Sequence, residues 1–462
     1  MRAPQPSPAV PVSVVPGAPV PGAPVIGHPL AYVRHRRGWS YAALLAEIAR
    51  SARAQGLPLG ELDRAKAHRW ETRGVVPEPA VQWALARVLG VPHGVARERP
   101  WPGWLPAYGG FPALESWSAG SAVEVLSGAV AGGPGDPRGY LGCWGPGLAA
   151  AARGWSDADP VPVTAVAAGP LAAGPGLLGA LAGQAALLRR TGPALPLPLA
   201  GELAWAQLRL ARELLAAGHR TAAQSRRLYL VVAELAHYAG WAAHDTGRHF
   251  AAQRYWWAGA QAAHCLGDRP LAAYVLLAIG HQAVRLGDTG AGLRLSEHAA
   301  RAAWRDASPA ARALLAGHLG LVQLAAGQDP RRVHAAARAA AGPARQNQRE
   351  TGPPPGWPLV PVRTGWPEPW LEWCARSGPA GWPGHGGRRV VLLDGGHRVV
   401  TLAGHRWPVR ESAAWGRAVP GQPPASTPQH LHQLAVQFAA AAGPGEAARL
   451  VRPGLRRLLR AA

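Results

Sequence analysis

The sequence predicts an all-α protein, and two observations support this fold class. First, apolar residues recur at helical spacing in segments that begin at Ser, Asp or Pro and end at Gly. Second, glycines that can end helices recur at regular spacing in the second half of the chain, at Gly247, Gly267, Gly287 and Gly327. A period of about 20 residues fits one helix and a turn, so we expect a repeated helical hairpin.

The composition limits the possible functions. The chain has 462 residues and a formal net charge of +22, which suggests a polyanionic partner, although its Arg-rich usage also fits GC-rich coding. Lys66 is its one lysine and lies in no Walker A, kinase or Schiff-base context. Cys143, Cys265 and Cys374 are far apart and fit reduced, buried thiols.

The N-terminal segment, 1–27, is interrupted by Pro too often to be a signal peptide and predicts a disordered tail. Residues 161–188 are uncharged over a length that could span a bilayer. Because Pro162, Pro170 and Pro175 break its first half, we favour a linker that leads into a helix from Leu177.

A short basic helix is predicted from Arg64 to Thr72, with Asp63 as its N-cap and Gly74 as its stop. At 100° per residue, Ala67 and Trp70 share the inward side. The opposite side is predicted to carry Ala65, His68, Arg69 and Thr72, flanked by Arg64 and Lys66. A small residue amid cations suits a helix that enters a major groove, whereas a solvated basic face is the alternative.

Helices on either side complete a domain at 28–94. One helix is expected after His28, a second begins at Tyr41 with Ser40 as N-cap, and another covers 78–89. The segments Arg37-Gly38-Trp39-Ser40, His68 to Gly74, and Leu85 to Pro92 make this domain resemble the Cro/C1-type (XRE) helix-turn-helix regulators. Gly74 to Pro79 and Trp101 to Pro106 are similar to an actinomycete subgroup of that family. Tyr41 and His68 depart from the usual Gln and Ser.

The resemblance implies a regulator that binds double-stranded DNA, and we expect a homodimer on paired half-sites. Arg69, His68 and Lys66 are expected in the major groove. The remaining expected phosphate and groove contacts are Arg36, Arg37, Ser40, Tyr41, Arg64, Ala65 and Arg73.

After a Pro/Gly/Trp-rich connector at 95–200 with weak helices, repeats are expected at 201–340. Asp245-Thr246-Gly247, Gln253 to Trp256, Gly267-Asp268 and Gly287-Asp288 make them resemble tetratricopeptide-like regions attached to the same regulators. We expect this region to support dimerisation or to bind a peptide or small-molecule effector. Four aromatic residues, Tyr238, Trp241, Tyr255 and Trp256, could line a ligand groove, or could form the core of the repeats.

A Pro/Trp-rich linker at 341–389 and a degenerate helical region at 390–462 are expected to end the chain. Residues 390–402 fit a hairpin or, as the alternative, a helix.

No pattern indicates an enzyme, a cofactor or a metal. His237, His244 and His249 share no helical face, and HExxH and GxSxG are absent. We expect a cytoplasmic, nucleoid-associated protein without a membrane span. A protein-interaction scaffold whose head has lost operator recognition is the alternative, motivated by Tyr41 and His68.

Overall fold

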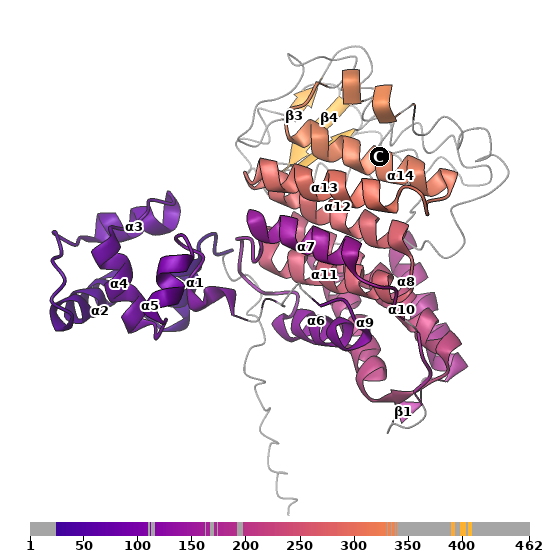
Figure 1. Ribbon diagram of the computed structural model, residues 1–462, viewed down its shortest axis with the longest axis horizontal. Coiled ribbons are helices and arrows are strands. Elements are labelled where there is room, and N and C mark those ends of the chain that lie inside the picture. The colour runs from indigo at the N-terminus through magenta and orange to yellow at the C-terminus, as the bar shows by residue number, and fades with distance from the viewer. Residues whose placement is uncertain are drawn as a thin grey trace, which may run out of the picture.

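A computed structural model gives the architecture of the chain (Figure 1). The structure describes residues 25–339, apart from 110, 112–115, 162, 167–170, 173, 192–196, 330, 334 and 338, and three strands between 390 and 408. The protein is mostly helical, as the sequence predicts. Its helices form a smaller unit, which we call the head (residues 28–108), and a larger one, the body (residues 117–325).

The head contains five helices and a 3-10 turn: α1 (Pro29–Arg36), α2 (Tyr41–Ala54), α3 (Arg64–Thr72), α4 (Pro79–Val88), α5 (His93–Glu98) and η1 (Pro106–Tyr108). The side chains of His28, Ser40 and Asp63 accept hydrogen bonds from the first turns of α1, α2 and α3. These caps satisfy N–H groups that have no partner within a helix. Gly74, with φ of 63°, follows the last turn of α3 in the left-handed conformation, as predicted.

The core of the head forms where α2 packs against α4 and α3. Leu44, Ile48 and Leu85 are completely buried in it, and Trp70 reaches it from α3. Trp104 and Leu105 are also buried there, so the head extends past its predicted boundary at residue 94.

The body contains nine described helices: α6 (Ala119–Gly132), α7 (Pro146–Asp157), α8 (Pro175–Thr191), α9 (Leu197–Ala217), α10 (Ala222–Asp245), α11 (His249–Cys265), α12 (Arg269–Arg285), α13 (Thr289–Ala303) and α14 (Pro309–Ala325). Helix α10 packs against α9 and α11, and α12 packs against α11, α13 and α14. The glycines at 247, 267, 287 and 327 all have positive φ and follow α10, α11, α12 and α14, so each marks the turn after a helix.

The segment predicted to be a connector is part of this packed structure. Helix α6 lies against α11 and α9, and α7 lies against α13. Leu126, Leu148 and Trp155 are 0% exposed in the core of the body. The sequence signal was weak because Ala and Gly fill much of these helices and contribute little to an amphipathic pattern.

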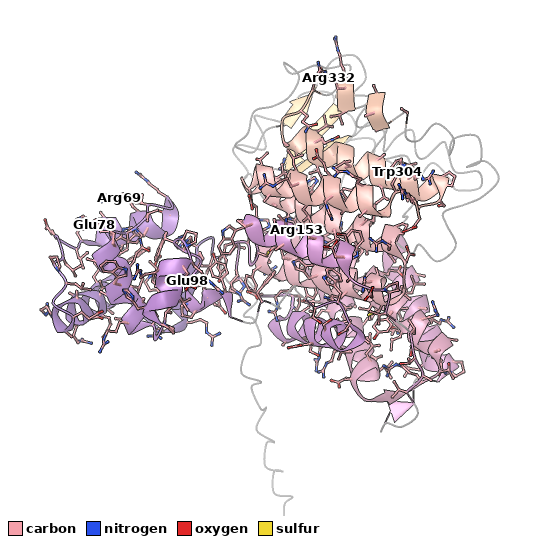
Figure 2. The ribbon with its side chains drawn as sticks, in the orientation of Figure 1. Arg69, Glu78, Glu98, Arg153, Trp304 and Arg332 are labelled. Atoms are coloured by element: carbon pink, nitrogen blue, oxygen red, sulfur yellow. The ribbon has the colours of Figure 1, made fainter. Side chains whose placement is uncertain are left out.

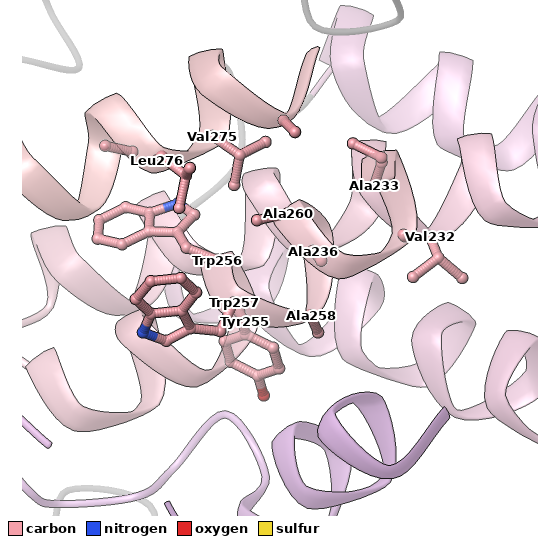
Figure 3. Packing of buried hydrophobic residues seen from close by; sticks show 14 of the residues in the cluster. Val232, Ala233, Ala236, Tyr255, Trp256, Trp257, Ala258, Ala260, Val275 and Leu276 are labelled. Carbon is pink, nitrogen blue, oxygen red and sulfur yellow. The ribbon is translucent and has the colours of Figure 1, made fainter. Parts of the chain in front are cut away.

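The aromatic residues of α11 lie at the centre of the body (Figure 3). Tyr255 is 1% exposed and Trp256 is 0% exposed. These two residues therefore belong to the core and cannot line an open groove, which corrects the ligand-groove interpretation for them. Tyr238 and Trp241 are partly buried against the same core.

Short strands complete the described residues. β1 (Leu171–Ala172) pairs in parallel with β2 (Gly218–His219). β3 (Val390–Leu392), β4 (Arg398–Leu402) and β5 (His405–Pro408) pair antiparallel in that order, so a hairpin rather than a helix describes 390–402. Among the described residues, no helix is both long and apolar enough to cross a membrane. The predicted tail through residue 24, the linker at 341–389 and residues 409–462 of the predicted helical region lie outside the described residues.

Candidate nucleic-acid interface

Helix α3 presents the face that its sequence predicts. Ala67 and Trp70 are 0% and 4% exposed and point into the head. Of the predicted DNA contacts, Arg36, Arg37, Ser40, Arg64, Ala65, His68 and Arg73 are exposed, whereas Tyr41, Lys66 and Arg69 are half-buried. Arg69 lies on α3 at the outer margin of the head (Figure 2). The helix therefore has an apolar inner side and an outer side rich in cations.

A buried ion pair holds α3 against α1. The guanidinium of Arg34 donates from Nε to Oε1 of Glu71 and from Nη2 to Oε2, both at 2.8 Å. The two side chains are 11% and 3% exposed. Two parallel charge-assisted hydrogen bonds fix the orientation of both partners, and the hydrogen bonds raise the pKa of Arg34. In the sequence Glu71 is only one residue of a motif, because no local signal links it to Arg34, which lies 37 positions earlier.

Tyr41 and His68, which differ from the residues usual in the regulators that the sequence resembles, contact each other. The hydroxyl of Tyr41 lies 3.4 Å from Nδ1 of His68 and donates to Oε2 of Glu71 at 2.9 Å. The guanidinium of Arg34 lies 4.2 Å from the centre of the Tyr41 ring. Burial and the hydrogen bond with Glu71 raise the pKa of Tyr41. The start of α2 and the middle of α3 are therefore joined by one polar network.

This network leaves the outer side of α3 cationic. Glu71 is the only carboxylate within α3, and it is buried against Arg34. The next acid along the chain, Asp63, caps the helix through a hydrogen bond from the Lys66 N–H at 2.6 Å. The exposed residues of α3 therefore include Arg64 and His68 and no acid. Such a surface attracts polyanions and repels other cationic surfaces.

Three of the predicted cations are engaged elsewhere in the head. The ammonium of Lys66 donates to the carbonyl of Glu61 at 2.5 Å, so it turns back toward the loop before α3. Arg36 donates to the hydroxyl of Tyr32, and Arg37 donates to the carbonyl of Val88 at the end of α4. The structure thus groups Arg34, Tyr41, Arg64 and His68, but gives Arg36, Arg37 and Lys66 other partners.

Aromatic residues join the head to the body. Phe250, in the first turn of α11, is 0% exposed and belongs to the core of the head together with Tyr140. The guanidinium of Arg138 stacks 3.6 Å from the centre of the Phe250 ring, and its Nη1 donates to the carbonyl of Ala107. Asp136 pairs with Arg138 at 2.6 Å. The orientation of α3 relative to the body is therefore set by packed side chains.

The turn at Gly247 brings together two histidines that sequence analysis had separated. Nδ1 of His244 lies 3.1 Å from Nδ1 of His249, on consecutive helices. The rings of His281 and His318 lie 5.7 and 6.1 Å from that of Trp241. The spacing of residues within one helix could not reveal this cluster, because its members come from α10, α11, α12 and α14. No set of three or more side chains suited to holding a metal occurs among the described residues.

Comparisons with protein-family models, with curated proteins and with solved structures find no match to this chain.

Proposed function

We propose that the protein is a sequence-specific, double-stranded-DNA-binding transcriptional regulator of the Cro/C1 helix-turn-helix type, in which α3 reads the major groove. One observation carries the proposal: the outer side of α3 bears cations, while its only carboxylate, Glu71, is buried and paired with Arg34. A helix of this kind can approach phosphates without repulsion and bring side chains to base edges.

Individual residues receive roles from their placement. His68 is exposed and Arg69 is half-buried at the outer margin of the head, and Arg favours the O6 and N7 atoms of guanine. Arg64 and Arg73 are exposed near the two ends of α3, where they suit phosphates. Lys66 is assigned a lesser role than its sequence position suggested, because its ammonium already has the carbonyl of Glu61 as a partner.

The body serves as a tetratricopeptide-like module for self-association or for sensing a peptide or small molecule. Its paired helices, repeated at glycine turns, support this assignment. With Tyr255 and Trp256 inside the core, an effector that uses the aromatic residues would contact Tyr238 and Trp241. Because Phe250 of α11 packs in the core of the head, effector binding to the body can affect the head through this contact.

A protein-interaction scaffold is the second candidate, and the Tyr41–His68 contact favours it. In that case the two residues would have lost base recognition and would serve only the polar network around Glu71.

Selection of duplexes from a random pool with the full-length protein tests the proposal. A regulator enriches one sequence, and its preference for that sequence persists as salt weakens the phosphate contacts. A scaffold shows only salt-dependent attraction without sequence preference at any ionic strength. Absence of enrichment at every salt concentration therefore rejects the proposed function and retains the scaffold.

A further inference from the structure

Helix α9 carries an exposed leucine stripe. Leu199, Leu203 and Leu210 are 44%, 42% and 38% exposed. Together with the exposed Ala206, they follow one another at separations of four, three and four residues, so they share one side of the helix. Ala200, Ala204, Leu208 and Ala211, which are completely buried, form the side that packs onto the body.

The position of α9 makes this stripe unusual. Figure 1 shows α9 at the end of the body that lies away from α14. Stacked helical repeats need a polar outer surface at their ends to stay monomeric. Here α9 instead places three large aliphatic side chains on its exposed side, which is typical of an interaction surface.

The spacing and the flanking charges identify the partner. Separations of four, three and four residues match the alternating seam positions of two-stranded coiled coils. Glu202 and Arg209 are exposed on the same flank of the stripe, one heptad apart. In an antiparallel pair, a twofold axis midway between Leu203 and Ala206 sets Leu199 opposite the partner's Leu210. It also sets Leu203 opposite the partner's Ala206 and places Glu202 beside the partner's Arg209.

A parallel pair lacks this complementarity. It would set Glu202 opposite the partner's Gln207, and Arg209 opposite the partner's Leu214, which is buried in its own subunit. The guanidinium of Arg209 already lies 5.0 Å from the centre of the Trp205 ring, which limits its freedom. Beyond Leu210 the stripe ends at Glu213, paired with Arg212 at 2.7 Å, so the seam covers about three turns.

We propose that two copies of this chain associate through α9, antiparallel and about a twofold axis midway between Leu203 and Ala206. The pairing deepens the proposed function, which requires two heads on paired half-sites. Because self-association is measured without DNA, failure of the pairing and failure of operator recognition are distinguishable.

A charge exchange in the full-length protein tests the pairing by sedimentation velocity. Glu202→Arg and Arg209→Glu should each raise the dimer dissociation constant by about three- to tenfold, because each leaves like charges opposed across the seam. The double variant E202R/R209E should restore the dimer. Single variants without effect, or a double variant no better than the singles, would overturn the antiparallel arrangement.

Substitution within the seam tests the surface itself. Leu203→Asp should weaken the dimer by at least about tenfold, because it buries a charge in an apolar contact. Leu286→Asp is the matched control, since Leu286 is 41% exposed at the end of α12. A wild-type chain that stays monomeric, or a Leu203→Asp variant that dimerises normally, contradicts the proposal.

A cysteine within the seam gives a result that does not depend on affinity. A short bismaleimide cross-linker should join Ala206→Cys between copies, whereas it should not join Ala216→Cys, which lies on another side of α9 and far from the axis. Cys143 and Cys265 are buried, and Cys374, which lies outside the described residues, is replaced by Ser throughout. Equal cross-linking of both variants, or of neither, would contradict an axis between Leu203 and Ala206.

Discussion

The ion pair between Arg34 and Glu71 determines which charges α3 shows to its surroundings. Because Glu71 is buried, its carboxylate neutralises Arg34 instead of the outward cations. Removing the carboxylate would leave a guanidinium enclosed without its partner, which is much costlier than losing a pair on the surface. One residue therefore serves both the stability of the head and the sign of its surface.

We expect Glu71→Ala to destabilise the head by about 3–5 kcal/mol. The matched control is Glu47→Ala, which removes the exposed pair with Arg50 and should cost about 0–1 kcal/mol. Amide hydrogen exchange in α1 to α3 measures the difference. Equal protection in the two variants would show that the buried pair contributes no more than the exposed one.

Tyr41 offers a smaller test of the same network. Tyr41→Phe keeps the ring beside Arg34 but removes the hydrogen bond to Glu71, so we expect a loss of about 0.5–1.5 kcal/mol. Urea unfolding of the head, followed by hydrogen exchange, measures this loss. A variant as stable as the wild type would mean that Glu71 is satisfied by Arg34 alone.

At the scale of elements, the fit of α10 against α11 depends on a residue without a side chain. A Cβ at Gly240 would collide with the indole of Trp256, whose Nε1 donates to the carbonyl of His237. We expect Gly240→Ala to destabilise the body by about 1–3 kcal/mol. Gly179→Ala in α8, where a Cβ has open space, should be neutral or stabilising by up to about 1 kcal/mol. Thermal unfolding of both variants compares them directly.

Histidines in α10 and α14 make the body sensitive to acid. Burial lowers the pKa of His237 to about 3 and that of His318 to about 4. Below a pH of about 6.5 these histidines are protonated in the unfolded chain but remain neutral in the folded chain. The free energy of unfolding therefore falls as the pH falls. The slope is up to about 1.4 kcal/mol per pH unit and per histidine. His318→Leu should reduce the slope of the free energy of unfolding, measured with urea, against pH. An unchanged slope would show that His318 does not cause the acid sensitivity.

The sequence predicted the elements better than their contacts. The limits of α3 and the glycine turns after α10, α11, α12 and α14 agree with those observed, because caps and glycine stops are local signals. The Arg34–Glu71 pair, the His244–His249 contact and the packing of α6 were not predictable in this way. Each joins residues on separate helices, and helical periodicity carries no information on which helices meet.

At the scale of the whole molecule, the head and the body share a core residue. Phe250 belongs to α11 but packs with Tyr140 in the core of the head, and Arg138 stacks on its ring. The head is therefore not tethered by a loose connector, contrary to what the Pro/Gly/Trp-rich sequence suggested. Side-chain packing therefore connects α11 directly to the core of the head.

We expect Phe250→Ala to cost about 3–5 kcal/mol and to release the head from the body. Hydrogen exchange should rise in α1 and at residues 136–140, while α12 and α13 remain protected. Trp83→Ala, at a position 37% exposed on α4, is the control and should leave the exchange at residues 136–140 unchanged. Equal protection at the junction in wild type and Phe250→Ala would show that the two units are coupled by other contacts.

The affinity of full-length Arg69→Ala for a selected duplex tests the central claim most directly, with Arg153→Ala, an exposed position on α7, as the control. If the outward arginine of α3 reads a base, Arg69→Ala weakens binding by about 1–3 kcal/mol and relaxes the preference at one base pair. Arg153→Ala should bind as the wild type does. Equal binding and equal sequence preference in Arg69→Ala and wild type would contradict the account.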